Sequence, residues 1–402
     1  MFMLDQFISD RVIKRKTSMF VSDISDNQEK ISEKVRGKTV LVIGGAGSIG
    51  SSFIKSILPF KPKTLIVVDT NENALAELTR DLRSTEGMFV PSDYIPYPMD
   101  FASPVFEKMF RSRGGFDIVG NFSAHKHVRS EKDIYSIEAL LQNNVLHAKL
   151  LLDLLSEYPP EEYFCVSTDK AANPVNIMGA SKRIMEDVIF SYSDKFPVKT
   201  ARFANVAFSN GSLPAGFLSR IQKLQPLSAP LDVKRFFVSP EESGQICLLA
   251  CILGENRAIF FPKLEEAQMM TFDAIGTELL KAYGYEVLEC DTDEEAIRKA
   301  EDLKKGSKYY PVHYSISNTS GEKPYEEFVT ESETADYERF KSLGVVIGKD
   351  IPDKEKIDTL FDDLTAAFEK TDIKKEEIVA IIKSYLPNFE HIEKGKSLDS
   401  KM

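Results

Sequence analysis

The segment from Val40 to Gly50 constrains the fold more than any other part of the chain. Its sequence, Val-Leu-Val-Ile-Gly-Gly-Ala-Gly-Ser-Ile-Gly, spaces three glycines as G-x-x-G-x-x-G. An apolar run over Lys38–Ile43 predicts a buried strand before them, and Ser51–Leu58 has a helical pattern after them. Such glycines let the backbone approach a diphosphate at the positive end of a helix. Close helix packing alone would also explain glycines here, but the strand–turn–helix context favours a ligand. We therefore predict a dinucleotide site at Gly44, Gly47, Ser48, Ile49 and Gly50.

Strand patterns alternate with helical patterns through the first half of the chain. Further strands are predicted at Thr64–Asp69, Phe116–Phe122, Glu162–Ser167 and Val198–Ala204. Helical patterns occupy Asn71–Arg83, Ile134–Tyr158 and Met178–Ser193. Strands joined by helices of this length are typical of right-handed β–α–β units. We therefore predict the α/β fold class, a doubly wound parallel sheet of the Rossmann type.

The chain divides into four predicted segments. Residues 1–36 form a helical arm, residues 37–205 an NAD-binding domain and residues 206–345 mainly a substrate-binding region. Residues 346–402 form a C-terminal extension with two amphipathic helices (353–370 and 374–386) and a flexible tail. The boundary at 205 rests on the loss of alternation and on recurrent prolines after it. The arm's apolar spacing fits packing on its own domain or on a partner subunit, while its basic run Lys14-Arg15-Lys16 leaves a membrane-surface anchor open.

Charge and composition exclude several classes of protein. The chain has 62 acidic and 51 basic residues and a formal net charge of −11, which argues against a large nucleic-acid interface. No apolar run approaches the roughly 18 residues of a membrane span, and the N-terminus lacks the apolar core of a signal peptide. We therefore expect a cytoplasmic protein without a transmembrane segment. The four cysteines form no C-x-x-C pair and are predicted to be buried free thiols, and no metal site is expected.

Two acidic residues are candidates for contacts with the adenosine half of the cofactor. Asp69 ends the second predicted strand, 19 residues after Gly50. A carboxylate there accepts hydrogen bonds from a ribose diol and repels a 2′-phosphate, so NAD is favoured over NADP. Asp100 follows a third strand, which is expected between Thr64–Asp69 and Phe116–Phe122. Contact with the adenine and a local turn are both plausible roles for it.

Polar side chains follow the predicted strand at Glu162–Ser167. Thr168, Asp169 and Lys170 come next and should emerge at the carboxyl edge of the sheet, beside the expected nicotinamide. A hydroxyl, an acid and an amine in one loop form an acid–base set, and Lys182 opens the next helix on the same cleft. The alternative is a capped turn, because Ser, Thr and Asp all favour the N-cap position.

Short motifs occur in order along about residues 37–330: Gly44–Gly50, Asn121–His127, Asn143–Val145, Ser167–Lys170, Met178–Lys182, Ala201–Val206, Lys234–Phe237 and Gly321–Glu327. Together they resemble the extended short-chain dehydrogenase/reductase family, in the group of nucleotide-sugar 4,6-dehydratases. The sequence is most similar to the polysaccharide-biosynthesis branch that acts on UDP-N-acetylglucosamine with retention at C5. Within that branch it resembles the dehydratases of legionaminic acid synthesis.

A 4,6-dehydration, which the resemblance implies, assigns a role to each polar residue of the loop. Asp169 would protonate the leaving O6 and Lys170 would remove the C5 proton, although these two roles can be exchanged. Thr168 would hydrogen-bond O4 and relay its proton, and Lys182 would hold the nicotinamide ribose. Met178 stands where most family members have the tyrosine of Tyr-x-x-x-Lys. A thioether cannot accept a proton, so another group must take the O4 proton.

The resemblance also implies contacts outside this loop. Ser123 and Ala124 would line the cofactor pocket, with Lys126 near the sugar or phosphate. Asn205 would contact the diphosphate or sugar, and Arg235 would clamp the nucleotide diphosphate. The family's Arg-Pro-Gly-Glu-Lys loop is here Thr-Ser-Gly-Glu-Lys at residues 319–323, and the missing arginine weakens a phosphate role.

The expected function is NAD-dependent dehydration of a UDP-sugar, with a GDP-sugar as the alternative substrate. Family members pair the helices that correspond to Ile134–Leu155 and Met178–Ser193 across a dimer interface, so a homo-oligomer is expected. Two other functions stay open. One is a C4 or C5 epimerase acting on the same sugar nucleotide, and the other is a non-catalytic NAD-sensing protein that kept the fold.

Overall fold

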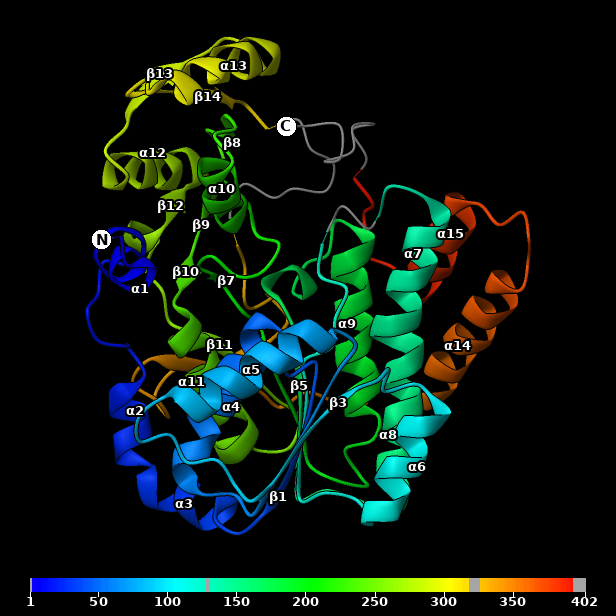
Figure 1. Cartoon of the computed structure of the whole chain (residues 1–402). Helices are drawn as coiled ribbons and strands as arrows, with labels where there is room; N and C mark the ends of the chain where they lie inside the picture. Colours follow the sequence, from blue (N-terminus) through cyan, green and yellow to red (C-terminus); the bar gives the residue numbers. More distant parts are fainter. Residues whose placement is uncertain (1, 128–130, 318–325, 393–402) are drawn as a thin grey trace.

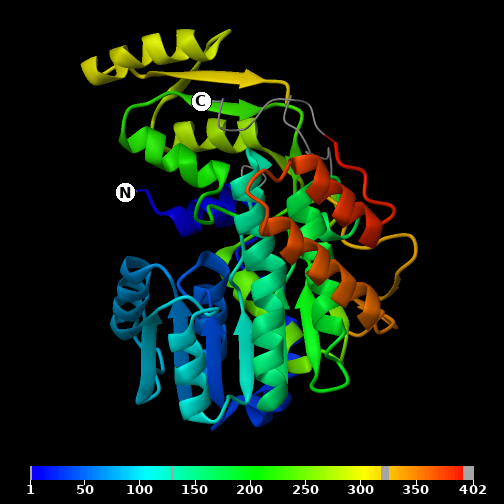
Figure 2. The same ribbon diagram turned by 90° about the vertical axis from the view of Figure 1, so that its right-hand side faces the viewer.

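The computed structural model describes residues 2–127, 131–317 and 326–392. A nine-stranded sheet forms its centre, with strand order β15-β16-β11-β6-β5-β4-β1-β2-β3 (Figures 1 and 2). The parallel strands are β1 (Thr39–Ile43), β2 (Thr64–Asp69), β3 (Asp93–Pro98), β4 (Ile118–Asn121), β5 (Glu162–Val166), β6 (Val198–Ala201) and β11 (Ala258–Pro262). Two antiparallel strands complete one edge, β16 (Leu343–Ile347) and β15 (Thr334–Asp336). The predicted α/β fold with a doubly wound parallel sheet is confirmed.

The strand order reverses between β1 and β4. The chain moves outward from β1 through β2 to β3, and then returns to place β4 on the other side of β1. Helices diverge from the sheet at such a reversal, which leaves a crevice at the carboxyl ends of the strands. The glycine turn after β1 and the loop after β4 both open into this crevice.

Alternating side chains of the central strands supply two separate cores. Val40 and Val42 face one core, with α3 (Gln28–Val35), α4 (Ser48–Ile57), α5 (Glu72–Ser84) and α11 (Pro240–Leu253). Leu41 and Ile43 face the other, with α6 (Pro104–Arg113), α7 (Ile134–Leu141), α8 (His147–Glu157) and α9 (Ile177–Phe190). A strand covered on both faces needs apolar residues throughout, which explains the unbroken apolar run in β1.

The C-terminal extension forms the two predicted helices, α14 (Lys354–Phe368) and α15 (Lys375–Tyr385). They pack beside α8 and α9, with Leu360, Leu364 and Ile378 buried in the same core (Figure 1). The predicted flexible tail, residues 393–402, lies outside the described residues. Within the described part of the chain, no helix is long and apolar enough to cross a bilayer. All four cysteines are buried and free, as predicted.

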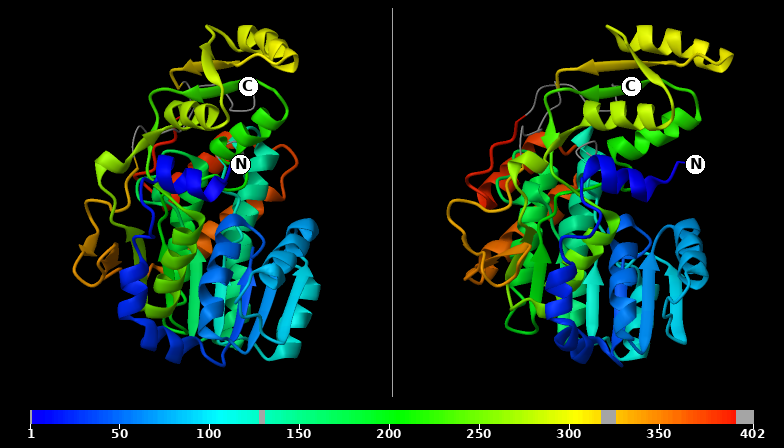
Figure 3. Two further views of the ribbon diagram at one scale, coloured as in Figure 1. Left: turned by 60° about the vertical axis from the view of Figure 1, so that its left-hand side comes forward. Right: turned by 90° about the vertical axis from the view of Figure 1, so that its left-hand side faces the viewer.

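The N-terminal arm packs on its own chain. In α1 (Leu4–Phe7) and the π-helical turn Ile8–Val12, the side chains of Phe7, Ile8 and Val12 are buried. They pack against the upper region, which is built above the sheet by part of residues 206–345. Figure 3 shows this helix between the sheet and that upper region. A second part of the arm, α2 (Val21–Asp26) and α3, continues along the sheet domain. The apolar spacing of the arm therefore serves intrachain packing.

The sheet does not end at residue 205, where we expected the NAD-binding domain to stop. β11, β15 and β16 come from later in the chain, and β11 is buried at every position because it lies between β6 and β16. The rest of residues 206–345 builds the upper region. It contains β8 (Leu227–Pro230), β13 (Glu286–Glu289) and β14 (Tyr309–Ser315) in a small parallel sheet, with α10 (Leu213–Gln222), α12 (Phe272–Ala282) and α13 (Asp293–Lys299).

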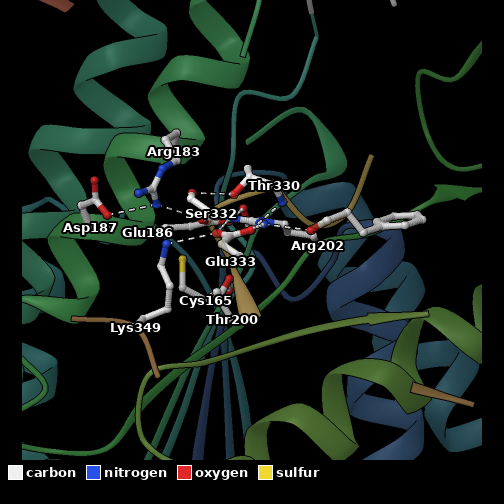
Figure 4. Close-up of polar contacts among 12 residues, drawn as sticks. Cys165, Arg183, Glu186, Asp187, Thr200, Arg202, Thr330, Ser332, Glu333 and Lys349 are labelled. Atoms are coloured by element: carbon white, nitrogen blue, oxygen red, sulfur yellow. Dashed lines mark hydrogen bonds and ion pairs between the residues drawn. The ribbon is translucent and has the colours of Figure 1, made fainter. Parts of the chain in front are cut away.

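A buried ion cluster joins the last strands of the sheet to α9 (Figure 4). Arg202 follows β6 and has no exposed surface. Its guanidinium donates to both carboxylate oxygens of Glu186, at 2.7 and 3.0 Å, and of Glu333, at 2.6 and 2.9 Å. Lys349 donates a further hydrogen bond to Glu333 at 3.0 Å.

The charge of Arg202 keeps both carboxylates ionised. Burial opposes ionisation, but the hydrogen bonds and charge of Arg202 outweigh it and lower the pKa of Glu333 to about 2. For Glu186 burial again opposes ionisation, and the neighbouring Arg202 holds its pKa below the usual value. Charge-assisted bidentate hydrogen bonds of this kind are strong, and they fix the geometry of the groups they join.

Replacing Arg202 should be severely destabilising. Arg202→Leu removes the cation that binds both buried carboxylates in a bidentate manner and leaves, among the described residues, only Lys349 near Glu333 and Arg183 near Glu186. We expect a loss on the order of 3–5 kcal/mol in the free energy of unfolding. Equilibrium denaturation in urea measures this. Arg80→Leu is the matched control, because Arg80 pairs with Glu77 on the exposed surface of α5 and should have little effect. Equal stabilities for the two variants would contradict the structural role of the cluster.

Candidate active site

The glycine turn brings β1, α4 and the loop after β4 into close contact. Gly44 has a φ of +70°, and a Cβ there would lie 2.6 Å from the backbone nitrogen of Ser123. A Cβ at Gly50 would lie 2.3 Å from the carbonyl oxygen of Gly44. Both positions therefore require glycine. The helix begins at Ser48, earlier than the predicted Ser51, so Ser48 and Ile49 lie in the first turn, where backbone N–H groups are free to bind an anion.

A cavity of about 450 Å³ opens beside the turn and contains both predicted adenosine contacts. Asp69 accepts a hydrogen bond from the Ala46 N–H at 3.1 Å and another from the Asn71 N–H at 2.9 Å. It therefore holds the glycine turn and faces the cavity at the same time. Asp100 accepts a hydrogen bond from the Ala102 N–H at 2.9 Å, so it shapes the local turn while lining the same cavity.

A second cavity, of about 380 Å³, contains most of the predicted catalytic and substrate residues. The two cavities share Gly44, Gly47, Phe122 and Ala124 in their walls. The glycine turn therefore stands between the two cavities. We call them the adenosine side (adenosine cavity) and the reaction side (reaction cavity), after the roles predicted for their residues. Ser48, Ile49, Gly50, Lys126, Thr168, Asp169, Lys170, Lys182 and Asn205 line the reaction side, and Ser123 lines the adenosine side.

The loop after β5 forms a chain of hydrogen bonds. The Thr168 hydroxyl donates to Asp169 Oδ1 at 2.7 Å, and Lys170 Nζ lies 3.1 and 3.2 Å from the two oxygens of the same carboxylate. Asp169 exposes only 7% of its surface. Ser167 points the other way and donates to Glu186 at 2.6 Å, which anchors the loop on the buried ion cluster. The Thr168 side chain also accepts a hydrogen bond from the Lys170 N–H and so caps a short helical turn. Thr168 therefore caps this turn and lines the cavity at the same time.

Lys182 and Met178 lie on the first turns of α9. Lys182 is buried and donates to the carbonyl oxygen of Val166 at 3.1 Å, and burial lowers its pKa. Met178 is buried in the wall of the reaction cavity. The Met178 N–H donates to the carboxylate of Glu131 at 3.0 Å, a contact that the sequence did not reveal.

The loop after β4 is held by two asparagines. Ser123 Oγ donates to Asn143 Oδ1 at 3.2 Å, while the His125 N–H donates to Asn144 Oδ1 at 2.9 Å. Both asparagines lie in a π-helical turn, Gln142–Leu146, that interrupts the long helix we expected over Ile134–Tyr158. Such turns often occur at functional sites. Lys126 lines the reaction cavity.

The remaining predicted substrate residues are only partly brought together. Asn205, in β7 (Asn205–Val206), lines the reaction cavity. Arg235, in β9 (Lys234–Arg235), is buried and donates to the carbonyl oxygen of Lys234, and it is not among the residues lining either cavity. The Thr-Ser-Gly-Glu-Lys stretch at 319–323 lies outside the described residues. Among the residues that the structure describes, no cluster of His, Cys, Asp or Glu could hold a metal ion.

Sequence reasoning missed Glu326 as a site residue. Its carboxylate accepts hydrogen bonds from the Asn205 side-chain amide and, at 2.7 Å, from the Phe236 N–H. The residue belongs to the Gly321–Glu327 motif, so the sequence indicated the segment but not this side chain. A glutamate in a charged segment is usually exposed, and only the tertiary packing shows that Glu326 is buried.

Comparisons with known proteins support the family. A family model described as polysaccharide biosynthesis protein matches residues 40–347. An uncharacterized membrane protein of Methanocaldococcus jannaschii is 30% identical over 89% of this chain and 99% of its own length. The chain spans 48% and 54% of the length of EpsC of Bacillus subtilis and CapD of Staphylococcus aureus, each 27% identical.

Two further relatives have named activities. An inverting UDP-N-acetylglucosamine 4,6-dehydratase of Campylobacter jejuni is 26% identical, with 57% of this chain and 67% of that protein covered. A UDP-glucose 4-epimerase of Rickettsia bellii is 28% identical, with 68% and 82% covered.

Solved structures show the same fold. Pen from Bacillus thuringiensis has a TM-score of 0.63 at 19% identity, covering 82% of this chain and 98% of that one. DesIV, a dTDP-glucose 4,6-dehydratase from Streptomyces venezuelae with NAD and TYD bound, has a TM-score of 0.54 at 19% identity, covering 72% and 88%. Because the family model covers most of the sheet and both cavities, the chain belongs to the polysaccharide biosynthesis protein family, within the extended short-chain dehydrogenase/reductases.

Proposed function

We propose that this protein is an NAD-dependent dehydratase that converts UDP-N-acetylglucosamine to the UDP-4-keto-6-deoxy sugar. One observation carries the proposal: Thr168, Asp169 and Lys170 form a hydrogen-bonded chain in the cavity that the glycine turn also lines. Retention at C5, a place in the synthesis of surface glycans or nonulosonic acids, and a homo-oligomeric state are parts of the same proposal.

The residues around the turn fit NAD. The tight approach at Gly44 and Gly50 leaves the N-terminus of α4 open to a diphosphate. Asp69 in the adenosine cavity suits a free ribose diol and would repel a 2′-phosphate. When bound, NAD would accept the hydride from C4 and return it to C6. Lys182 would hold the nicotinamide ribose from the buried start of α9.

The hydrogen-bonded chain offers a proton route that does not need a tyrosine. The O4 proton passes through the Thr168 hydroxyl to the ionised Asp169, which lies 2.7 Å away. Lys170 is paired with Asp169 as an ammonium, so it acts as a base only after it has released a proton to solvent. The free amine then removes the C5 proton, and Asp169 delivers its proton to O6, which leaves as water. Lys170 returns a proton to C5 and regains its own from solvent, so both residues end as they began. The return of the hydride to C6 would keep the conversion redox neutral.

A sugar-nucleotide epimerase is the second candidate, because a relative at 28% identity is named UDP-glucose 4-epimerase. A C4 epimerase returns the hydride to C4 and loses no water. Asp169 beside Lys170 favours elimination, since an acid for O6 and a base for C5 are then both present.

Incubation with UDP-N-acetylglucosamine in D2O tests the proposal by proton NMR. We expect a new 6-methyl signal with deuterium at C5, and the ring couplings report whether C5 is retained. A changed C4 coupling without a methyl signal would establish epimerisation. No change with the UDP-sugar or with its GDP-linked counterpart would favour the non-catalytic alternative.

Replacing Lys170 should stop the chemistry while sparing binding. Lys170→Met removes the base, and acid–base groups of this kind contribute about 10²- to 10⁴-fold to the rate. We expect kcat and the exchange of the C5 proton to fall by that factor, with little change in the dissociation constant of the UDP-sugar. Lys223→Met, at an exposed lysine beyond α10, is the control. Unchanged turnover in Lys170→Met would exclude Lys170 as the base.

Replacing Asp69 should relax the choice of cofactor. Asp69→Ala removes the acceptor of the Ala46 N–H and the negative charge in the adenosine cavity. Loss of a hydrogen bond to a charged group costs about 1.5–3 kcal/mol, so we expect NAD to bind roughly 10- to 100-fold more weakly. Calorimetric titration with both cofactors should show NADP losing less affinity than NAD. An unaltered preference would mean that the ribose is recognised elsewhere.

A further inference from the structure

Glu326 is a buried carboxyl group that is hydrogen-bonded to Asn205, a residue that lines the reaction cavity. Only 7% of its surface is exposed. One oxygen accepts a hydrogen bond from the side-chain amide of Asn205, and the other accepts one from the Phe236 N–H at 2.7 Å. Both of these donors are neutral. The hydrogen bonds therefore fix the orientation of the carboxyl group without supplying the positive charge that a buried carboxylate normally requires.

Among the residues that the structure describes, the charged groups that act on Glu326 are Asp169 and Lys170 on the loop after β5 and Arg235 on β9. Lys170 already forms an ion pair with Asp169, at 3.1 Å. A second carboxylate beside this pair is repelled by Asp169, and burial removes the water that would stabilise it. Lys170 and Arg235 oppose these effects but do not overcome them. Burial first, and then the charge of Asp169, raises the pKa of Glu326 to about 8.

We propose that Glu326 is a positioning residue for the reaction: it remains protonated in the working protein, aligns Asn205 on the cavity wall and keeps a second negative charge away from Asp169 and Lys170. This inference deepens the proposed function and rests on it for its catalytic consequence. Its physical part, a proton held on Glu326 in the folded protein, depends only on the fold.

Ionisation of Glu326 has a defined effect on the loop. A second carboxylate favours the protonated form of Lys170, which cannot accept the C5 proton. It also raises the proton affinity of Asp169 and so disturbs the balance between donor and acceptor. The rate should therefore fall as the pH rises through about 8. For a single group with this pKa, about a tenth remains protonated one pH unit higher, so we expect roughly a tenfold loss by pH 9.

Glu326→Gln is the informative variant, because its amide is neutral at every pH and has nearly the same shape. We expect it to keep most of the wild-type kcat at pH 7 and to lose the alkaline decline between pH 7 and 9. Glu326→Ala should instead raise KM, because Asn205 loses its acceptor. Glu331→Gln, an exposed glutamate in the same segment, should keep the wild-type profile. An alkaline decline that persists unchanged in Glu326→Gln would overturn the catalytic part of the proposal.

A stability measurement tests the proton itself without any substrate. The pKa of Glu326 is higher in the folded state than the ordinary value of 4.5. The stability that this group contributes is therefore complete below pH 4.5 and is lost as the pH rises through about 8. We expect the Tm of Glu326→Gln, relative to wild type, to increase from pH 5 to about pH 8 and to level off by pH 9, while that of Glu331→Gln stays constant. A pH-independent difference for Glu326→Gln would overturn the proposal. If the Tm difference rises with pH but the protein does not dehydrate the sugar, the protonation of Glu326 is supported and only the proposed reaction is rejected.

Discussion

The buried hydrogen bonds of Arg202 are the interaction on which the arrangement of the site depends. One guanidinium joins the end of β6, the middle of α9 and the turn before β15, three segments that are far apart in the sequence. Glu186 also accepts a hydrogen bond from the hydroxyl of Ser167, so the loop after β5 is anchored on the same cluster. An ion cluster of this kind tolerates little displacement, because each carboxylate in it would be costly to bury alone. The positions of α9 and of the loop after β5 are therefore coupled.

The reversal of strand order between β1 and β4 determines where this fixed loop can act. It opens a crevice at the carboxyl edge of the sheet, and the close contacts at Gly44 and Gly50 place the start of α4 in that crevice. One side of the glycine turn suits a ribose and the other suits a reacting sugar. The same turn can thus hold a diphosphate between the two halves of a cofactor.

The absence of a tyrosine at Met178 changes how protons can move in this site. A family tyrosine would act from α9, whereas here Thr168, Asp169 and Lys170 are linked within one loop. A compact acid–base group is sensitive to any further charge nearby. In the proposed mechanism, the ionisation of Glu326 would alter the charge around that group. Its hydrogen bond to Asn205 would link the same ionisation to the cavity wall.

The sequence alone determined the elements whose signals are local. The apolar run and glycine spacing of Val40–Gly50 predict a strand, a turn and a helix, because backbone sterics and periodicity are properties of neighbouring residues. Thr168, Asp169 and Lys170 were predicted to share one loop for the same reason, since they are adjacent in the chain. The start of α4 was misplaced, at Ser51 rather than Ser48, and the long helix predicted over Ile134–Tyr158 is interrupted by a π-helical turn.

Only the tertiary structure decided which distant residues meet. It added β11 and β16 to the sheet, left Arg235 off the walls of the two cavities and brought Glu326 into hydrogen-bond contact with Asn205. The physical reason is that these outcomes depend on burial and charge pairing between segments separated by long loops. The free energy of such a contact depends on everything packed around it, so a buried glutamate and an exposed one have the same appearance in sequence.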